Sequence, residues 1–339
     1  MATLPDYFDP HSQLARHWDR TLAEFAAPQS PPIDPVLAER HTIHAGLLAA
    51  IVDSWWNGNS RGARDSDYPM RAAQRREDGS YLGDRLGDRY LGHNIAAIAV
   101  DATGRVRDLD FNHNALYDSS VQHAEARLVR RLFDLDGLDA RDGATGDDGR
   151  RRTSLDGITI FTSLESCAQC AGIMALARLP QVFYLQPDPG QYLVAQLLHR
   201  LSDTPVALHL PASAFGFPAF DQLTTAYASF RQSLAKGAFF WRSTTEPSHM
   251  DRTPAVTSFL CTDAAREIYR QAASDFAGMT CRFPDARPGR AGESTPSPGE
   301  AGDDGSRCDV LSNAEVLADA RRFLDYATRS ARRGTPHFN

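Results

Sequence analysis

Lysine is almost absent from this chain. Lys236 is the only lysine among 339 residues, and arginine supplies the rest of the 36 basic side chains. A phosphate-binding P-loop requires a lysine, and so does a Schiff base with a carbonyl substrate. Both kinds of chemistry are therefore excluded from most of the chain.

Cysteine is also sparse. The chain has Cys167, Cys170, Cys261, Cys281 and Cys308. An odd, sparse set in a chain of this length is not a disulfide framework. Cys167 and Cys170 form a Cys-x-x-Cys pair, which in a reducing compartment indicates metal or redox chemistry. We expect the other three to be unligated thiols.

Long apolar runs are missing as well. No stretch approaches the ~18 residues that a membrane helix needs. The acidic N-terminus, residues 1–9, lacks the charged-then-apolar order of a signal peptide. We therefore expect a cytoplasmic protein with no membrane partner. The formal net charge of −7 argues against a dedicated nucleic-acid binder, because phosphate backbones are bound by clustered positive charge.

The residues that are present alternate between helix-like and strand-like patterns. Strands are expected at 95–100, 106–111, 157–162, 182–185 and 206–210. Helices are expected at 35–56 after an Asp34 cap, and at 121–135, 167–179, 192–201, 219–235, 261–277 and 312–333. This order predicts an α/β fold, a three-layer α/β/α sandwich around a five-stranded mixed sheet, with helical N- and C-terminal extensions.

Composition divides the chain into five parts. These are an N-terminal extension at 1–33, the α/β domain at 34–210, a helical C-terminal extension at 211–283, a linker at 284–308 and a basic C-terminal helix at 309–339. The linker is rich in proline, glycine, serine and aspartate, so it is expected to be disordered.

One histidine and two cysteines are spaced as metal ligands. Cys167 and Cys170 are three residues apart and would share one face of a helix, and His123 precedes them. One imidazole and two thiolates leave the fourth tetrahedral position open, as in catalytic zinc sites. Glu125 lies two residues after the histidine, where its carboxylate could carry a proton between a metal-activated water and a substrate.

Both halves of this group are expected at helix starts. Ser119 and Ser166 each have a glutamine three residues later, which is the spacing of a capping box. The first turn of a helix stabilises anions through its N–H groups. A thiolate needs that help, because only the deprotonated sulfur binds metal.

His-Ala-Glu followed by Cys-x-x-Cys resembles the signature of the cytidine deaminase-like zinc deaminases. Residues 162–174, which read T-S-L-E-S-C-A-Q-C-A-G-I-M, look most like the branch that holds tRNA adenosine deaminase and the guanine and cytosine deaminases. The resemblance covers about residues 34–210. It implies a zinc deaminase domain in which His123, Cys167 and Cys170 bind Zn²⁺ and Glu125 is the catalytic proton shuttle.

One departure from that branch is Ser166, which stands where the family has proline. Because serine can cap a helix, we expect it to replace the proline without loss, and a Ser166→Pro variant to be tolerated.

Substrate contacts are expected from three residues that precede the histidine motif. In the adenosine deaminase branch, an asparagine eleven residues before the histidine holds the base. Asn112 has that spacing, and Asn114 is close to it. The alternative for both is a turn after a strand. His93 precedes the first strand of the sheet, where the family's fold lines its pocket.

These observations leave three functions open. The favoured one is a zinc-dependent hydrolytic deaminase that converts an exocyclic amine of a nucleobase, nucleoside or nucleotide to a carbonyl and releases ammonia. The alternatives are a polynucleotide deaminase acting on tRNA or single-stranded DNA, and a non-catalytic, zinc-stabilised interaction subunit. We expect a small-molecule nucleobase or nucleoside partner in preference to nucleic acid, and a homo-oligomer, a dimer.

Two further groups of basic residues are candidate sites. His41 and His44 lie three apart on the first predicted helix, where we expect a solvated face, with a second metal site as the alternative. For the C-terminal arginines we also expect a solvated face, with a phosphate-binding surface as the alternative. These arginines are residues 321, 322, 329, 332 and 333.

Overall fold

The computed structural model describes six main stretches of the chain. These are residues 32–56, 92–141, 153–201, 207–234, 256–288 and 310–329 without positions 115, 116, 118 and 192, together with positions 21, 24, 63–64, 239–241 and 250–251. Most of the N-terminal extension, most of the expected linker and the last residues of the expected basic helix lie outside the described residues.

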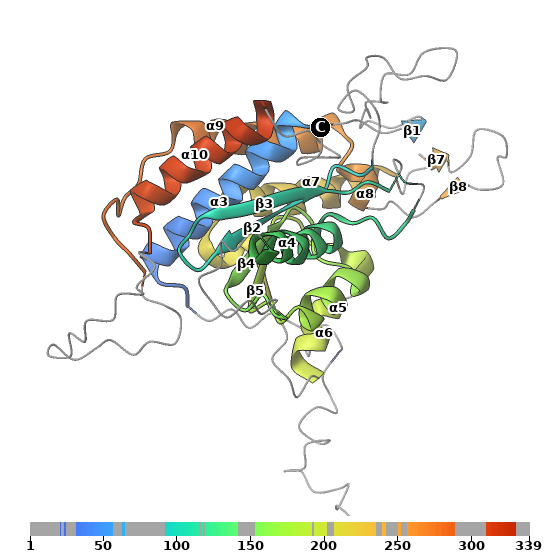
Figure 1. Cartoon of the computed structure of the whole chain (residues 1–339). Helices are drawn as coiled ribbons and strands as arrows, with labels where there is room; N and C mark the ends of the chain where they lie inside the picture. The colour runs from blue at the N-terminus through green and yellow to red at the C-terminus, as the bar shows by residue number, and fades with distance from the viewer. Residues whose placement is uncertain are drawn as a thin grey trace, which may run out of the picture.

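A five-stranded mixed sheet lies at the centre of the fold (Figure 1). It consists of β2 (Ala96–Asp101), β3 (Val106–Phe111), β4 (Ile158–Thr162), β5 (Gln181–Tyr184) and β6 (Leu208–Pro211), in the order β3-β2-β4-β5-β6. Strand β2 pairs antiparallel with both β3 and β4, whereas β4, β5 and β6 are parallel. The predicted α/β sandwich with a five-stranded mixed sheet is confirmed.

The β2–β3 hairpin follows directly from its sequence. All of Ala96–Val100 is buried, which explains the continuous apolar run in this strand. Gly104 lies in the turn to β3 with a φ of 96°, a left-handed conformation that glycine adopts without strain. The hairpin places β3 at the edge of the sheet, next to the loop that leads to His123.

Helices cover both faces of the sheet. On one side, α3 (Pro35–Ser54) lies next to the sheet, with α9 (Asp263–Gly278) and α10 (Asn313–Arg329) packed along it (Figure 1). On the other side lie α4 (Ala124–Arg141), α5 (Ala168–Leu176) and α6 (Val194–Leu201). The helices beyond residue 211 therefore help to bury α3.

The remaining elements are shorter or lie near the ends of the sheet. They are the 3₁₀ helices η2 (Pro189–Gln191) and η3 (Ala212–Phe215), helices α7 (Pro218–Leu234) and α8 (Val256–Phe259), and a small sheet of β1 (Ala63–Arg64), β7 (Phe239–Trp241) and β8 (Met250–Asp251). Within the described ranges, no helix has the length and apolar character needed to cross a membrane.

Helix α3 begins as predicted, but its histidines are not solvated. The side chain of Asp34 accepts hydrogen bonds from the backbone N–H groups of Val36 and Leu37. His41 and His44 are only 6 % and 1 % exposed. The predicted solvated face is wrong at these positions, because the sheet and the C-terminal helices enclose α3.

The arginines of α10 that the structure describes have partners within the molecule. Arg321 donates to the carbonyl oxygens of Ala277 and Met279 at the end of α9. Arg322 and Arg329 pair with aspartates one turn away on their own helix. Arg321 thus joins α10 to α9, while the other two lie on an exposed helix face.

Candidate metal centre

The structure brings His123, Cys167 and Cys170 together. His123 lies immediately before α4, Cys167 is the N-cap residue of α5, and Cys170 lies in the first turn of α5. The Nδ1 atom of His123 is 3.3 Å from the Sγ atom of Cys167 and 3.5 Å from that of Cys170. The two sulfur atoms are 3.7 Å apart.

These separations fit a tetrahedral zinc ion. Bonds of about 2.3 Å to sulfur and about 2.0 Å to nitrogen at tetrahedral angles put two sulfur atoms about 3.8 Å apart and a sulfur and a nitrogen about 3.5 Å apart. The three ligand atoms lie within 4.8 Å of one another, and no fourth ligand joins the group among the described residues. The donor set and its spacing therefore suit a zinc ion that keeps one position for a non-protein ligand.

Hydrogen bonding within the group sets its charges. The Cys170 thiol is the largest cause of a lowered pKa at Cys167, which falls to about 4, and the hydrogen bond with His123 acts in the same direction. The Cys167 bond raises the pKa of His123 and also that of Cys170. The low pKa of Cys167 favours its thiolate, which is the form that binds metal.

Glu125 is buried beside this group. It lies in the first turn of α4 and is 3 % exposed. Its Oε1 atom accepts hydrogen bonds from the hydroxyl groups of Thr162 and Ser166, both at 3.2 Å, and its Oε2 atom is 3.5 Å from the Sγ atom of Cys170. Burial raises the pKa of the Glu125 carboxyl, so that it holds a proton more readily than an exposed glutamate.

Helix α4 begins three residues later than predicted. Val121 lies in a turn, Gln122 and His123 have no regular structure, and the first helical residue is Ala124. Its backbone N–H donates to the Oδ1 atom of Asn112 at 2.7 Å. The predicted Ser119 cap is therefore wrong: a side chain from the end of β3 binds the helix start instead.

The predicted cap at the second helix is wrong as well. Cys167 is the N-cap of α5, and no side chain caps this helix. The hydroxyl group of Ser166 is bound to Glu125, whereas the Gln169 side chain donates to the Val121 carbonyl oxygen at 2.9 Å. Ser166 thus contacts the candidate proton shuttle, a contact that the comparison with the family's proline does not predict.

The three expected substrate contacts lie on two adjoining segments. Asn112 is buried, and the Nδ2 atom of Asn114 donates to the Ser119 carbonyl oxygen at 3.4 Å. Gly92, immediately before His93, packs so closely that a Cβ atom there would lie 2.5 Å from the carbonyl oxygen of Asn112. The role of these residues toward a substrate stays a prediction.

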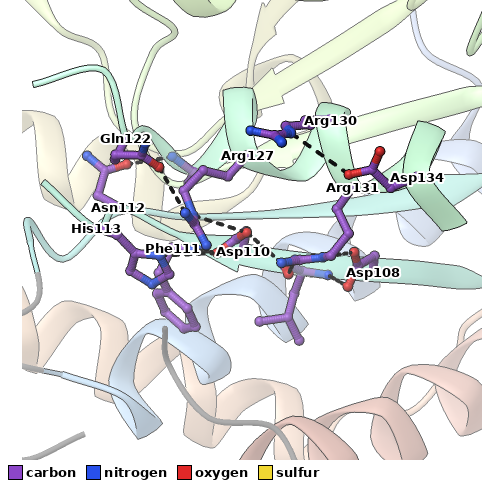
Figure 2. Close-up of polar contacts among 12 residues, drawn as sticks. Asp108, Asp110, Phe111, Asn112, His113, Gln122, Arg127, Arg130, Arg131 and Asp134 are labelled. Atoms are coloured by element: carbon purple, nitrogen blue, oxygen red, sulfur yellow. Dashed lines mark hydrogen bonds and ion pairs between the residues drawn. The ribbon is translucent and has the colours of Figure 1, made fainter. Parts of the chain in front are cut away.

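An ion-pair network that the sequence analysis missed holds α4 on β3 (Figure 2). Arg131 contacts the carboxylates of both Asp108 and Asp110, at 2.5 and 2.7 Å, and Arg127 lies 3.3 Å from Asp110. Both aspartates are completely buried. The signal was present: aspartates at alternate positions share a strand face, and arginines four apart share a helix face.

No family model and no curated protein matches this chain. Among solved structures, a chain from a study of A-to-I editing by tRNA:A34 deaminases at the wobble position of transfer RNA is 20 % identical, with a TM-score of 0.25 over 34 % of this chain and 77 % of that one. A guanine deaminase from Nitrosomonas europaea is 13 % identical, with a TM-score of 0.23 over 37 % of this chain and 70 % of that one. Likeness at this level does not assign a function.

Proposed function

We propose that this chain is a zinc-dependent hydrolytic deaminase that acts on the exocyclic amine of a nucleobase, nucleoside or nucleotide. The observation that supports the proposal most strongly is the buried carboxylate of Glu125 beside three converging metal ligands, with Oε2 3.5 Å from the Sγ atom of Cys170. A purely structural zinc site fills all four positions with protein ligands and has no use for such a carboxylate.

The chemistry divides between the metal and the chain. Zinc, when bound by His123, Cys167 and Cys170, supplies a Lewis acid that makes water nucleophilic near neutral pH. Glu125 would carry one proton of the attacking water to the ring nitrogen next to the amine and the second proton to the leaving amine, so that water and the amine become a carbonyl and ammonia. The Thr162 and Ser166 hydroxyl groups orient the carboxylate by binding Oε1.

Asn112 is proposed to position the ring of the substrate. Because an N–H group can only donate, the Ala124 backbone requires the Oδ1 atom of Asn112 as its acceptor. The Nδ2 hydrogens of the amide are then left for the substrate. We therefore expect Asn112 to bind an acceptor, such as a ring nitrogen or a carbonyl oxygen, and not an N–H group of the base.

A small molecule is the proposed substrate in preference to a polynucleotide. The net charge is −7, and the described arginines of α10 pair within the molecule. A nucleic-acid deaminase would need a basic surface for the flanking nucleotides, and its activity would fall steeply with salt. Localisation in the cytoplasm and assembly as a dimer stay predictions.

Ammonia release from zinc-loaded protein tests the proposal. The panel consists of free bases, nucleosides and nucleotides of adenine, guanine and cytosine, beside tRNA and single-stranded DNA, each at ~50 and ~200 mM salt. Glu125→Gln is the matched control, because it keeps the shape of the side chain but cannot carry the proton. It should keep zinc and lose about 10²- to 10⁴-fold in turnover.

The outcomes separate the alternatives. Release from a polynucleotide alone, with strong salt inhibition, would replace the small-molecule substrate by a nucleic acid. Zinc-loaded, folded protein that releases ammonia from no member of the panel would favour the interaction subunit. Normal turnover by the Glu125→Gln variant would remove this residue from the mechanism.

A further inference from the structure

A cavity of about 550 Å³ lies at the end of the sheet where β4 and β5 begin. Gly157 and Thr159 of the β4 segment and Gln181 of β5 line one side, and Arg40 and His41 of α3 line another. The metal-binding residues lie beyond the opposite end of β4. The cavity is therefore separate from the candidate metal centre, and its volume is in the range of small-molecule sites.

Arg40 places a buried positive charge at this cavity. The residue is 5 % exposed, and its Nε atom donates to the Oδ1 atom of Asn313 at 3.2 Å. Another guanidinium nitrogen donates to the carbonyl oxygen of Leu311. These partners are neutral. Burial and the neighbouring Arg287 lower the pKa of Arg40 to about 10, so the group stays charged at neutral pH.

His41 adds a donor that has no partner among the described residues. It is 6 % exposed, and neither of its ring nitrogens has a hydrogen-bond partner there. Its ring lies 4.4 Å from that of Phe183 and 5.7 Å from that of Phe161, which also lines the cavity. Buried polar groups in folded proteins normally have partners, but both nitrogens of His41 are enclosed by the protein, so its N–H group reaches the cavity only when the ring turns about its bond to Cβ.

The other polar groups at the cavity do not neutralise Arg40. Asp101 accepts hydrogen bonds within the β2–β3 turn through Oδ1, and its Oδ2 atom is 3.8 Å from Arg107. Asp156 is exposed at the rim. The Nε2 atom of His44 is 3.1 Å from the carbonyl oxygen of Gly104, which can only accept, so the N–H group of the neutral ring donates to that oxygen.

We propose that this cavity is a second ligand site, which binds a small organic anion that carries an aromatic ring. The anionic oxygens would accept hydrogen bonds from the Arg40 guanidinium and from the N–H group of His41. The ring would lie against Phe161 and the apolar wall formed by Leu37 and Val100. Charged hydrogen bonds supply the affinity, and the apolar wall selects a ring over a simple ion.

Ligand-observed NMR titrations of the full-length, zinc-loaded protein test this proposal. The probes are benzoate, its neutral isostere benzamide, and acetate, which has the charge without the ring. Because a carboxylate can also coordinate zinc, the titrations are repeated after chelation and dialysis. Benzoate should bind about ten- to hundredfold more tightly than benzamide, and more tightly than acetate, with and without the metal.

Three variants locate the site. Arg40→Gln removes the charge, and His41→Phe keeps an aromatic ring for the contact with Phe183 but has no N–H. Arg130→Gln is the matched control, because Arg130 is exposed on α4 and its loss removes the same charge and only an exposed pair with Asp134. Benzoate binding should weaken about tenfold or more in the first two variants and stay unchanged in the control.

The outcomes are decisive even if Arg40→Gln disturbs folding. Circular dichroism identifies that case. The benzoate affinity of His41→Phe then tests the proposal by itself, because this variant keeps Arg40 and its hydrogen bonds to Asn313 and Leu311. Equal affinity for benzoate and benzamide, unchanged benzoate binding in His41→Phe, or no binding by any probe would each overturn the proposal. None of these results depends on deaminase activity.

Discussion

Glu125 is a buried carboxylate whose orientation depends on two hydroxyl groups. Thr162 has a single hydroxyl hydrogen and two acceptors in reach, Oε1 of Glu125 at 3.2 Å and the carbonyl oxygen of Leu164 at 3.1 Å. The hydroxyl group of Ser166 donates to Oε1 of Glu125 at 3.2 Å, and the residue is only 1 % exposed. Ser166 is therefore the more important of the two donors.

Replacing Ser166 should slow turnover without removing zinc. A hydrogen bond to a charged group contributes ~1.5–3 kcal/mol, so Ser166→Ala should lower kcat by about ten- to a hundredfold. Ser166→Pro should do the same, contrary to the expectation from the family's proline. Thr162→Val is the comparison and should lower kcat by less, because the Thr162 hydroxyl divides its hydrogen bond between Glu125 and the Leu164 carbonyl oxygen. Steady-state kinetics with zinc analysis check this, and a fully active Ser166→Pro variant would contradict it.

Gly92 allows two backbone segments to approach beside the candidate substrate site. A Cβ atom at this position would lie 2.5 Å from the carbonyl oxygen of Asn112 and 3.0 Å from the backbone nitrogen of Asn114. Since both contacts are with backbone, the segment that carries Asn112 must move to make room. The bond from Ala124 to Asn112 would move with it.

Gly92→Ala should therefore disturb substrate binding more than zinc binding. We expect a raised KM, retained zinc, and a loss of ~1–3 kcal/mol in the free energy of unfolding, as is usual for overpacking. Gly172→Ala on α5 is the matched control, because a Cβ atom there meets nothing within 4 Å. Alanine should stabilise that helix by ~0.5–1 kcal/mol. Urea unfolding and steady-state kinetics distinguish the two variants, and equal effects would contradict the argument.

The pairing of α4 with β3 depends on charges buried between them. Arg131 is the central group, because it contacts both Asp108 and Asp110 as well as the Leu109 carbonyl oxygen (Figure 2). Burial raises the pKa of Asp110, an effect that Arg131 and Arg127 oppose. The network fixes the helix that carries Glu125 against the strand that leads to Asn112.

Removal of Arg131 should destabilise the whole fold. Arg131→Met leaves two buried carboxylates with less compensation, and breaking a buried pair in this way costs ~3–5 kcal/mol. Arg130→Met, one residue earlier, is the control. Arg130 lies 3.9 Å from Asp134, and the two side chains are 84 % and 69 % exposed, so the loss of this pair should change the free energy of unfolding by less than ~1 kcal/mol. Urea unfolding measures both. Similar losses in the two variants would show that the network contributes little.

The elements could be predicted from sequence where their signals are local. The strands are short apolar runs between turn residues, and α3 begins at an Asp34 cap. The start of α4 could not be predicted in this way, because its first N–H is bound by Asn112 across a loop. The burial of His41 and His44 likewise depends on segments far away in the chain. The spacing of His123, Cys167 and Cys170 predicts that they could bind a metal, but the contact between Ser166 and Glu125 can be recognised only in the folded structure.

Segments outside the resemblance to zinc deaminases complete the packing around α3. The indole N–H of Trp55 donates to the Ala327 carbonyl oxygen of α10 at 2.9 Å, and Arg266 of α9 lies 3.5 Å from Asp53. As a result, α3 is enclosed between the sheet on one side and α9 and α10 on the other. This enclosure places uncharged histidines in the interior of the molecule.

Three buried histidines should make the fold sensitive to mild acid. Burial lowers the pKa of His41 to about 3 and the pKa values of His44 and His209 to about 4. Each folded-state pKa is below the unfolded value of about 6.5. The unfolded chain therefore binds more protons between pH 6.5 and 4, and the stability present above pH 6.5 is lost progressively as the pH falls through this window.

The variant His41→Phe measures the contribution of one of these histidines to the pH dependence of stability. The difference in unfolding free energy between this variant and the original chain should shift in favour of the variant as the pH falls below 6.5, by up to about 1.4 kcal/mol per pH unit. Urea titrations at several pH values measure that difference. Acid would also release a bound metal, but the effect on stability is the same in both proteins and cancels in the difference. The difference should therefore be the same in zinc-loaded and chelated protein, because His41 lies at the other end of the sheet from His123, Cys167 and Cys170. A difference that stays constant from pH 7 to 4.5 would mean that His41 is hydrated and titrates normally in the folded state.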